Sequence, residues 1–212
     1  MTLNMDNNFN KNVFINCPFD PAYIQLLRPI LFTVIYLGYN PRIALERFDS
    51  GEARIKKICE LIGISKLSIH DISRMKSTRK SEYFRLNLAF ELGIDIGCRL
   101  FMNGQAKDKK CLILEKDKYE YQKALSDLSN SDIKSHNNEP EEVVRHVRDW
   151  FVNNEIPTAD SHTRIWDNYN VYMTDFDIKR KKEGWRENDL ERMPIPSTVR
   201  LGSCKGAPET HR

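Results

Sequence analysis

The sequence lacks any apolar run that could cross a membrane. Its longest apolar stretch, from Ile30 to Leu37, is far shorter than the ~20 residues that a membrane-spanning helix needs. Residues 1–8 contain neither the basic segment nor the apolar segment of a secretory signal peptide. These absences predict a cytoplasmic protein that makes no contact with a membrane.

Cysteines at the paired spacing of a zinc site are also missing, although the chain has 5 cysteines. We therefore expect no metal site. Free thiols in a reducing compartment are the simplest account of these residues. Because most of them lie in apolar segments, we expect them to be buried. They are Cys17, Cys59, Cys98, Cys111 and Cys204.

Neither sign of charge is in large excess, since 33 basic and 30 acidic residues give a net charge of +3. This balance is too mild to indicate nucleic-acid binding by itself. Two basic runs, 74–80 and 179–182, could follow a nucleic-acid backbone, but such runs are usually solvated protein surface. Nucleic acid is therefore only a weakly supported partner.

Glycine-rich motifs for nucleotide phosphates are absent as well. The sequence contains neither Gly-x-Gly-x-x-Gly nor Gly-Lys-Ser/Thr, which argues against a Rossmann dinucleotide fold and against a P-loop. Ser-Gly-Glu at 50–52 could cradle a phosphate at a helix start, but the neighbouring carboxylates oppose a bare phosphate.

Short apolar segments alternate about five times with stretches of helical periodicity. This alternation predicts an α/β fold, a doubly wound and mostly parallel five-stranded sheet with helices on both faces. Right-handed crossovers favour the flavodoxin-like strand order 2-1-3-4-5. The expected strands are 13–17, 42–46, 67–72, 111–114 and 132–136, and the expected helices are 21–37, 55–62, 84–100, 119–128 and 140–151.

Two of the expected helices carry more detailed predictions. Asp20 is placed to cap the first helix and Gly38 to end it. The helix at 84–100 is apolar almost all round, so we expect it to be buried.

The pattern changes after Pro157, which suggests three parts. Residues 1–155 would form the α/β domain, 156–193 a helical extension, and 194–212 a polar, flexible tail. Aromatic residues recur at helical spacing in the extension, so this helix either packs back on the domain or faces a partner. They are Trp166, Tyr169, Tyr172 and Phe176.

Ligands of open α/β sheets bind beyond the carboxyl ends of the strands, and polar residues gather there in this sequence. Carboxylates, arginines and an asparagine follow the first three strands, which is more polar than a passive edge requires. We predict that these residues bind the substrate: Asn16, Phe19, Asp20, Glu46, Arg47, Asp49, Asp71, Ser73 and Arg74.

Glu91 is the strongest single candidate for a functional residue, because it interrupts the apolar run 88–94. Burying a carboxylate is costly unless the group is paired or its pKa rises. We expect it in a cleft at the carboxyl ends of the strands, as a nucleophile or as a stabiliser of a positive, sugar-like centre. The alternative is that Glu91 points to solvent or pairs with Arg85 or Arg99.

Three residues in or just after these strands have more than one possible role. Asp71 either accepts a hydrogen bond from a ligand or caps a nearby backbone amide. His70, in the middle of a strand, is more often a satisfied core histidine than a ligand-binding one. Cys17 follows the first strand, but no histidine is placed to activate it, which favours a packing thiol.

The sequence resembles the TIR and TIR-like superfamily of flavodoxin-like domains, to which the nucleoside 2-deoxyribosyltransferases are related. The matching segments are 13–16, 51–55, 67–73 and 88–93, within a resemblance that covers about residues 11–155. The resemblance implies that Glu91 is the catalytic glutamate. Asn87 departs from the pattern, since TIR domains often carry an aromatic residue there.

Both groups of relatives cleave or exchange an N-glycosidic bond, so the resemblance implies that chemistry on NAD or on a related nucleotide or nucleoside. The nucleotide would be substrate, and no separate cofactor is expected. Arg47 or Arg74 would hold a pyrophosphate, and Asp71 or Asp49 would protonate a leaving base.

The biological setting implied by the resemblance is bacterial antiphage defence or a toxin system. Self-association or a sensor protein would control such an effector. The alternative is a non-catalytic TIR-like module, which binds a nucleotide signal or another protein.

Overall fold

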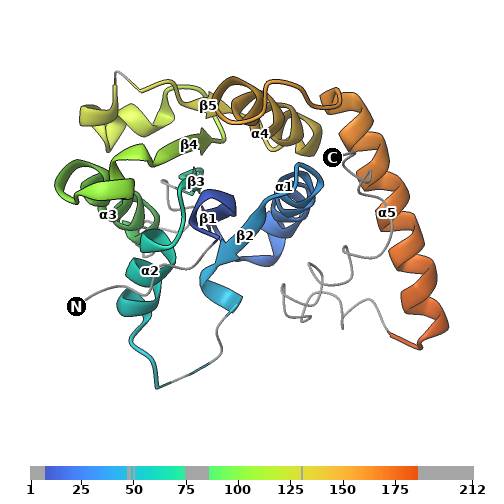
Figure 1. Ribbon diagram of the computed structural model, residues 1–212. Coiled ribbons are helices and arrows are strands. Elements are labelled where there is room, and N and C mark those ends of the chain that lie inside the picture. The colour runs from blue at the N-terminus through green and yellow to red at the C-terminus, as the bar shows by residue number, and fades with distance from the viewer. Residues whose placement is uncertain (1–7, 47–48, 50, 75–85, 130, 186–212) are drawn as a thin grey trace, which may run out of the picture.

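A computed structural model describes residues 8–46, 49, 51–74, 86–129 and 131–185. Its centre is one five-stranded sheet in which every pair of neighbouring strands is parallel, in the order β2-β1-β3-β4-β5 (Figure 1). This confirms the predicted α/β fold class and the predicted strand order. The strands are β1 (Asn12–Asn16), β2 (Asn40–Ile43), β3 (Leu67–Asp71), β4 (Lys110–Glu115) and β5 (Lys134–Ser135).

Helices cover both faces of this sheet. Helices α1 and α4 pack on one face, α2 and α3 on the other, and α5 runs along the outside of α1 and α4 (Figure 1). None of the described helices is both long and apolar enough to span a membrane. The helices are α1 (Ile24–Tyr36), α2 (Arg54–Gly63), α3 (Leu86–Phe101), α4 (Pro140–Asn154) and α5 (His162–Lys182).

Strand β1 shows why the strands of the sheet could be predicted from the sequence. Val13 and Ile15 belong to the core beneath α1 and α4, whereas Phe14 packs with α2 on the opposite face. Because successive side chains of a strand point to opposite faces, a strand covered on both sides reads as a continuous apolar run.

Both expected caps of the first helix are present. The Asp20 side chain accepts a hydrogen bond from the Tyr23 amide at 3.1 Å, and Pro21 occupies the first helical position. A short 3₁₀ turn at Pro21–Tyr23 leads directly into α1. Gly38 follows the helix with a φ of +80°, a conformation that favours glycine.

The predicted helix at 119–128 is wrong. That segment forms two 3₁₀ turns, Glu120–Lys123 and Ser126–Leu128. The carboxylate of Glu115 accepts hydrogen bonds from the backbone amides of Tyr119 and Tyr121, and Tyr119 takes a φ of +65°. These two constraints divert the backbone from a continuous helix.

Two predicted strands need corrected bounds. Strand β2 begins at Asn40 and ends at Ile43, so Ala44–Glu46 is a 3₁₀ turn rather than the end of the strand. The Glu46 carboxylate binds the side chain of Arg42, and this local pair favours a turn. Strand β5 is only two residues long, within the wider segment expected there.

The expectation that α3 is buried all round is also wrong. Phe90 and Phe101 are 61% and 84% exposed, whereas Glu91 and Asp95 are each 3% exposed. The face of the sheet beneath α3 carries the polar side chain of His70, which hydrogen-bonds Asp95. Polar groups of the helix therefore turn inward.

The cysteines are free in the part of the chain described, but burial differs among them. Cys17 is buried, Cys98 and Cys111 are partly buried, and Cys59 is exposed on α2, contrary to expectation. Cys204 lies outside the described residues.

Helix α5 packs back on the domain, which was one of the two alternatives for the extension. The ring of Phe32 on α1 contacts the rings of Tyr169 and Tyr172, and Tyr36 donates a hydrogen bond to Asp160 just before α5. The helix lies within the predicted extension, whereas the predicted tail at 194–212 lies outside the described residues.

Replacing Gly38 tests the turn that ends α1. Gly38→Ala is expected to lower the free energy of unfolding by about 1–2 kcal/mol, because alanine resists a positive φ. Gly38→Asn should cost less, since asparagine tolerates this conformation. Urea denaturation measures both, and equal losses for the two variants would contradict the account.

Candidate functional site

The carboxyl ends of β1 and β3 bring three predicted carboxylates together around Cys17. Burial raises the pKa of the Cys17 thiol well above its ordinary value, and the nearby charges of Asp71, Glu91 and Asp20 raise it further. The thiol is therefore neutral, which supports its interpretation as a packing residue rather than a nucleophile. Three of the residues predicted for the site therefore lie near one another, around Cys17.

Glu91 projects inward from the middle of α3, and its side chain is 4% exposed. Its cationic partner is Arg54 of α2, with 3.5 Å between Arg54 Nη2 and Glu91 Oε1. Burial raises the pKa of Glu91, and Arg54, His70 and Asn87 offset part of that rise. Arg54 is itself 53% exposed, so one solvent-facing guanidinium balances a buried carboxylate. Arg85, one of the two expected partners, lies outside the described residues.

Asp71 is fully buried and is surrounded by hydrogen-bond donors. It accepts hydrogen bonds from the hydroxyl of Tyr23, from the backbone amide and the hydroxyl of Ser73, and from His136 Nε2 at 3.0 Å. The pKa of Tyr23 is raised by burial and by the charge of Asp71, so the phenol keeps its proton. Asp71 thus joins the 3₁₀ turn before α1, the end of β3 and the segment after β5.

Ser73, His136 and Asp71 resemble a catalytic triad in composition but not in geometry. The ring nitrogen His136 Nδ1 accepts a hydrogen bond from the Asn138 amide at 3.0 Å, which places the histidine proton on Nε2. Both Ser73 and Asp71 contact that same Nε2. A base that already carries its proton there cannot take one from Ser73.

Asp20 and Arg74 form a partly exposed pair at the same edge, with 3.2 Å between Arg74 Nη2 and Asp20 Oδ1. The remaining predicted residues have other surroundings. Glu46 pairs with Arg42, and Asp49 is exposed and accepts a hydrogen bond from the Gly51 amide. Phe19 packs against the core beneath α1, and Arg47 lies outside the described residues.

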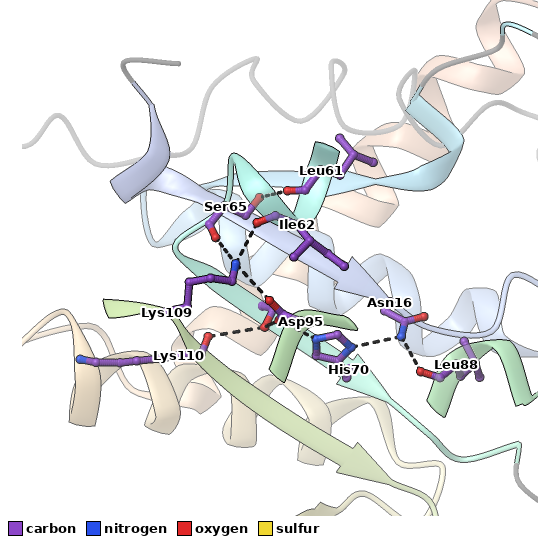
Figure 2. A network of polar contacts seen from close by, with 10 residues as sticks. Asn16, Leu61, Ile62, Ser65, His70, Leu88, Asp95, Lys109 and Lys110 are labelled. Carbon is purple, nitrogen blue, oxygen red and sulfur yellow. Dashed lines mark hydrogen bonds and ion pairs between the residues drawn. The ribbon is translucent and has the colours of Figure 1, made fainter. Parts of the chain in front are cut away.

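A chain of buried polar side chains runs beneath the site (Figure 2). Asn16 Nδ2 contacts the Leu88 carbonyl at 2.9 Å and His70 Nδ1 at 3.1 Å. His70 Nε2 lies 3.0 Å from Asp95, whose other oxygen lies 3.1 Å from Lys109 Nζ.

At the Lys109 end, this series of polar side chains also binds the backbone. Lys109 Nζ donates to the carbonyl oxygens of Ile62 and Ser65, at the end of α2. Ser68 donates a further hydrogen bond to Asp95. Burial alone would raise the pKa of Asp95, but His70, Lys109 and Ser68 together hold it well below its usual range.

His70 is therefore a satisfied core histidine, as the sequence favoured. Asp95, Lys109 and His136 are the polar residues that sequence reasoning missed. Only Asp95 left a signal, since it follows Glu91 at a spacing of four within the largely apolar segment 88–98. The described residues contain no group of three or more side chains placed to hold a metal ion.

Comparisons of the chain with protein-family models, with curated proteins and with solved structures found no match.

Removing the charge of Asp95 tests how much the buried polar contacts contribute to the stability of the fold. Asp95→Asn leaves Lys109 without its anion, so we expect a loss of about 3–5 kcal/mol in the free energy of unfolding at pH 7. The pKa of Asp95 is lower in the folded state than in the unfolded state, so its contribution is present above about pH 5 and declines as the pH falls.

The difference between wild type and Asp95→Asn should therefore shrink from pH 6 to pH 3. Urea midpoints across that range measure it. A difference that stays constant over the range would show that the Asp95 carboxylate is not stabilised in the folded state.

Proposed function

We propose that the protein cleaves or exchanges the N-glycosidic bond of NAD or of a related nucleotide or nucleoside, with Glu91 as the carboxylate that faces the reacting sugar. The observation that carries this proposal is the buried Glu91, held at the carboxyl edge of the sheet by one half-exposed arginine. The resemblance of residues 11–155 to TIR-like domains supports the same glutamate.

The environment of Glu91 suits a positively charged transition state. Glycosidic bond cleavage passes through an oxocarbenium-like sugar, which a nearby carboxylate can stabilise or trap. Electrostatic attraction is strong in a buried site, because little water screens it. Arg54 lowers the pKa of Glu91 and so favours the ionised form that this role requires.

The surroundings of Asp71 favour a substrate whose leaving group needs no proton. Its oxygens accept hydrogen bonds from Tyr23, Ser73 and His136, so Asp71 is a positioning residue in this conformation rather than an available acid. Nicotinamide leaves NAD without prior protonation, because it is already cationic in the substrate. A nucleoside base would require an acid. Within the proposed class, NAD is therefore our first choice.

Arg74 is the described residue best placed to bind the substrate pyrophosphate. Its guanidinium is 39% exposed and is held by Asp20 near the buried carboxylates. A guanidinium binds phosphate oxygens in a bidentate manner, so the substrate would compete with Asp20 for it. The resemblance adds the setting of a bacterial defence or toxin effector.

A second candidate is a TIR-like module that binds a nucleotide signal without turnover. The burial of Glu91 favours it, since a substrate would reach that carboxylate only after α3 or its surroundings move. The two functions differ in whether the bound nucleotide is consumed.

Mass spectrometry of cellular nucleotides separates these functions. Expression of the wild-type chain should deplete NAD or a related nucleotide, and Glu91→Gln should slow that loss by at least ~100-fold because the stabilising charge is gone. Glu141→Gln, the same change at an exposed site on α4, is the control and should behave as wild type. Unchanged nucleotide pools with all three chains would contradict the enzyme.

The pH dependence tests the role of Arg54. Without that guanidinium, the pKa of Glu91 rises further, so the acid limb of the kcat/KM profile of Arg54→Gln should move to higher pH. Lys56→Gln on the same helix removes an exposed charge of the same sign and should leave the profile in place. Coinciding acid limbs for all three proteins would contradict the role given to Arg54 in lowering the pKa of Glu91.

A further inference from the structure

Helix α3 turns its two acidic side chains inward and leaves several of its apolar side chains exposed. Glu91 and Asp95 are buried against the sheet, and the opposite side of the helix carries only apolar residues and glycines. We call this side the outer face of α3. It consists of Leu86, Phe90, Gly93, Gly97, Leu100 and Phe101, and Met102 follows it.

The apolar surface left open here is large for a single helix. At roughly 200 Å² for a fully exposed large side chain, these residues leave on the order of 600 Å² in contact with water. Single exposed apolar residues are ordinary, but contiguous patches of this size mark interaction sites. The exposed fractions are 58% for Leu86, 61% for Phe90, 63% for Leu100, 84% for Phe101 and 50% for Met102.

The outer face is also symmetric about its middle. Counted from position 95, Phe90 and Leu100 lie five residues away on either side, and Gly93 and Gly97 lie two residues away. Two antiparallel copies of α3 crossing at this level would place each glycine opposite the other copy's second glycine, and each Phe90 opposite a Leu100. A surface that complements itself in this way fits an isologous interface with two-fold symmetry.

The two glycines permit the close approach that such a crossing needs. A side chain added at Gly93 would meet no atom within 4 Å, and one added at Gly97 would meet only the ring of Phe101. Small residues at a crossing point allow two helix backbones to pack closely, with larger side chains interlocking on either side.

We propose that the outer face of α3 is the interface through which two copies of this chain form a symmetric dimer. Contributions on the order of 600 Å² from each copy give about 1,200 Å² in all, which reaches the lower end of the range for specific interfaces. No charged residue belongs to the face, so association buries no unpaired charge. Glu91 occupies the inner side of the same helix, and the dimer does not depend on the proposed activity.

Analytical ultracentrifugation of the full chain tests the dimer. Wild type should show a concentration-dependent doubling of its 24.9 kDa mass at micromolar concentrations. Phe90→Glu and Gly93→Leu should each raise the dissociation constant at least ~10-fold, the first by placing a charge in the interface and the second by blocking the crossing. Leucine is a better helix former than glycine, so Gly93→Leu removes the contact without weakening the helix.

Val171→Glu is the matched control, because Val171 is 61% exposed on α5, away from α3. This variant should dimerise as wild type does. Glu91→Gln should also remain dimeric, which separates this proposal from the enzymatic one. A monomeric wild type overturns the dimer. In that case, a lower melting temperature for Phe90→Glu would indicate that another segment of the chain covers the face, and an unchanged one would indicate a different partner. A dimer that survives both α3 substitutions also overturns the proposal.

Discussion

The buried carboxylate of Asp95 is the interaction on which the orientation of α3 depends. It receives hydrogen bonds from His70 and Ser68 of β3 and pairs with Lys109 just before β4. Breaking one member of such a buried set leaves the others without partners, which costs far more than a surface ion pair. Helix α3 is therefore fixed to the sheet through polar contacts as well as apolar packing.

Two further properties of α3 follow from this orientation. Glu91 lies one turn before Asp95, so it also points inward and reaches the carboxyl edge of the sheet. The apolar residues on the remaining side, with Phe90 and Phe101 the most prominent, must then face outward. The candidate catalytic group and the candidate dimer interface lie on opposite sides of one helix, and the buried polar contacts of Asp95 contribute to the placement of both.

Asp71 supplies the second fixed point, at the other side of the site. By accepting hydrogen bonds from Tyr23, Ser73 and His136, it connects the 3₁₀ turn before α1 with the end of β3 and the segment after β5. A group so fully bonded is suited to positioning rather than to proton transfer. Glu91 differs from Asp71 in that burial raises its pKa and its cationic partner, Arg54, is half exposed.

The sequence alone determined the strand order, because parallel strands buried on both faces appear as apolar runs such as 13–15. It predicted a candidate site at the edge where the carboxyl ends of these strands meet. It also singled out Glu91 and the caps at Asp20 and Gly38, which depend on local chemistry. Only the tertiary structure decided which side of α3 faces inward, which arginine pairs with Glu91, and that the segment after Glu115 forms 3₁₀ turns. Those outcomes depend on contacts between residues far apart in the chain, and helical periodicity carries no information about them.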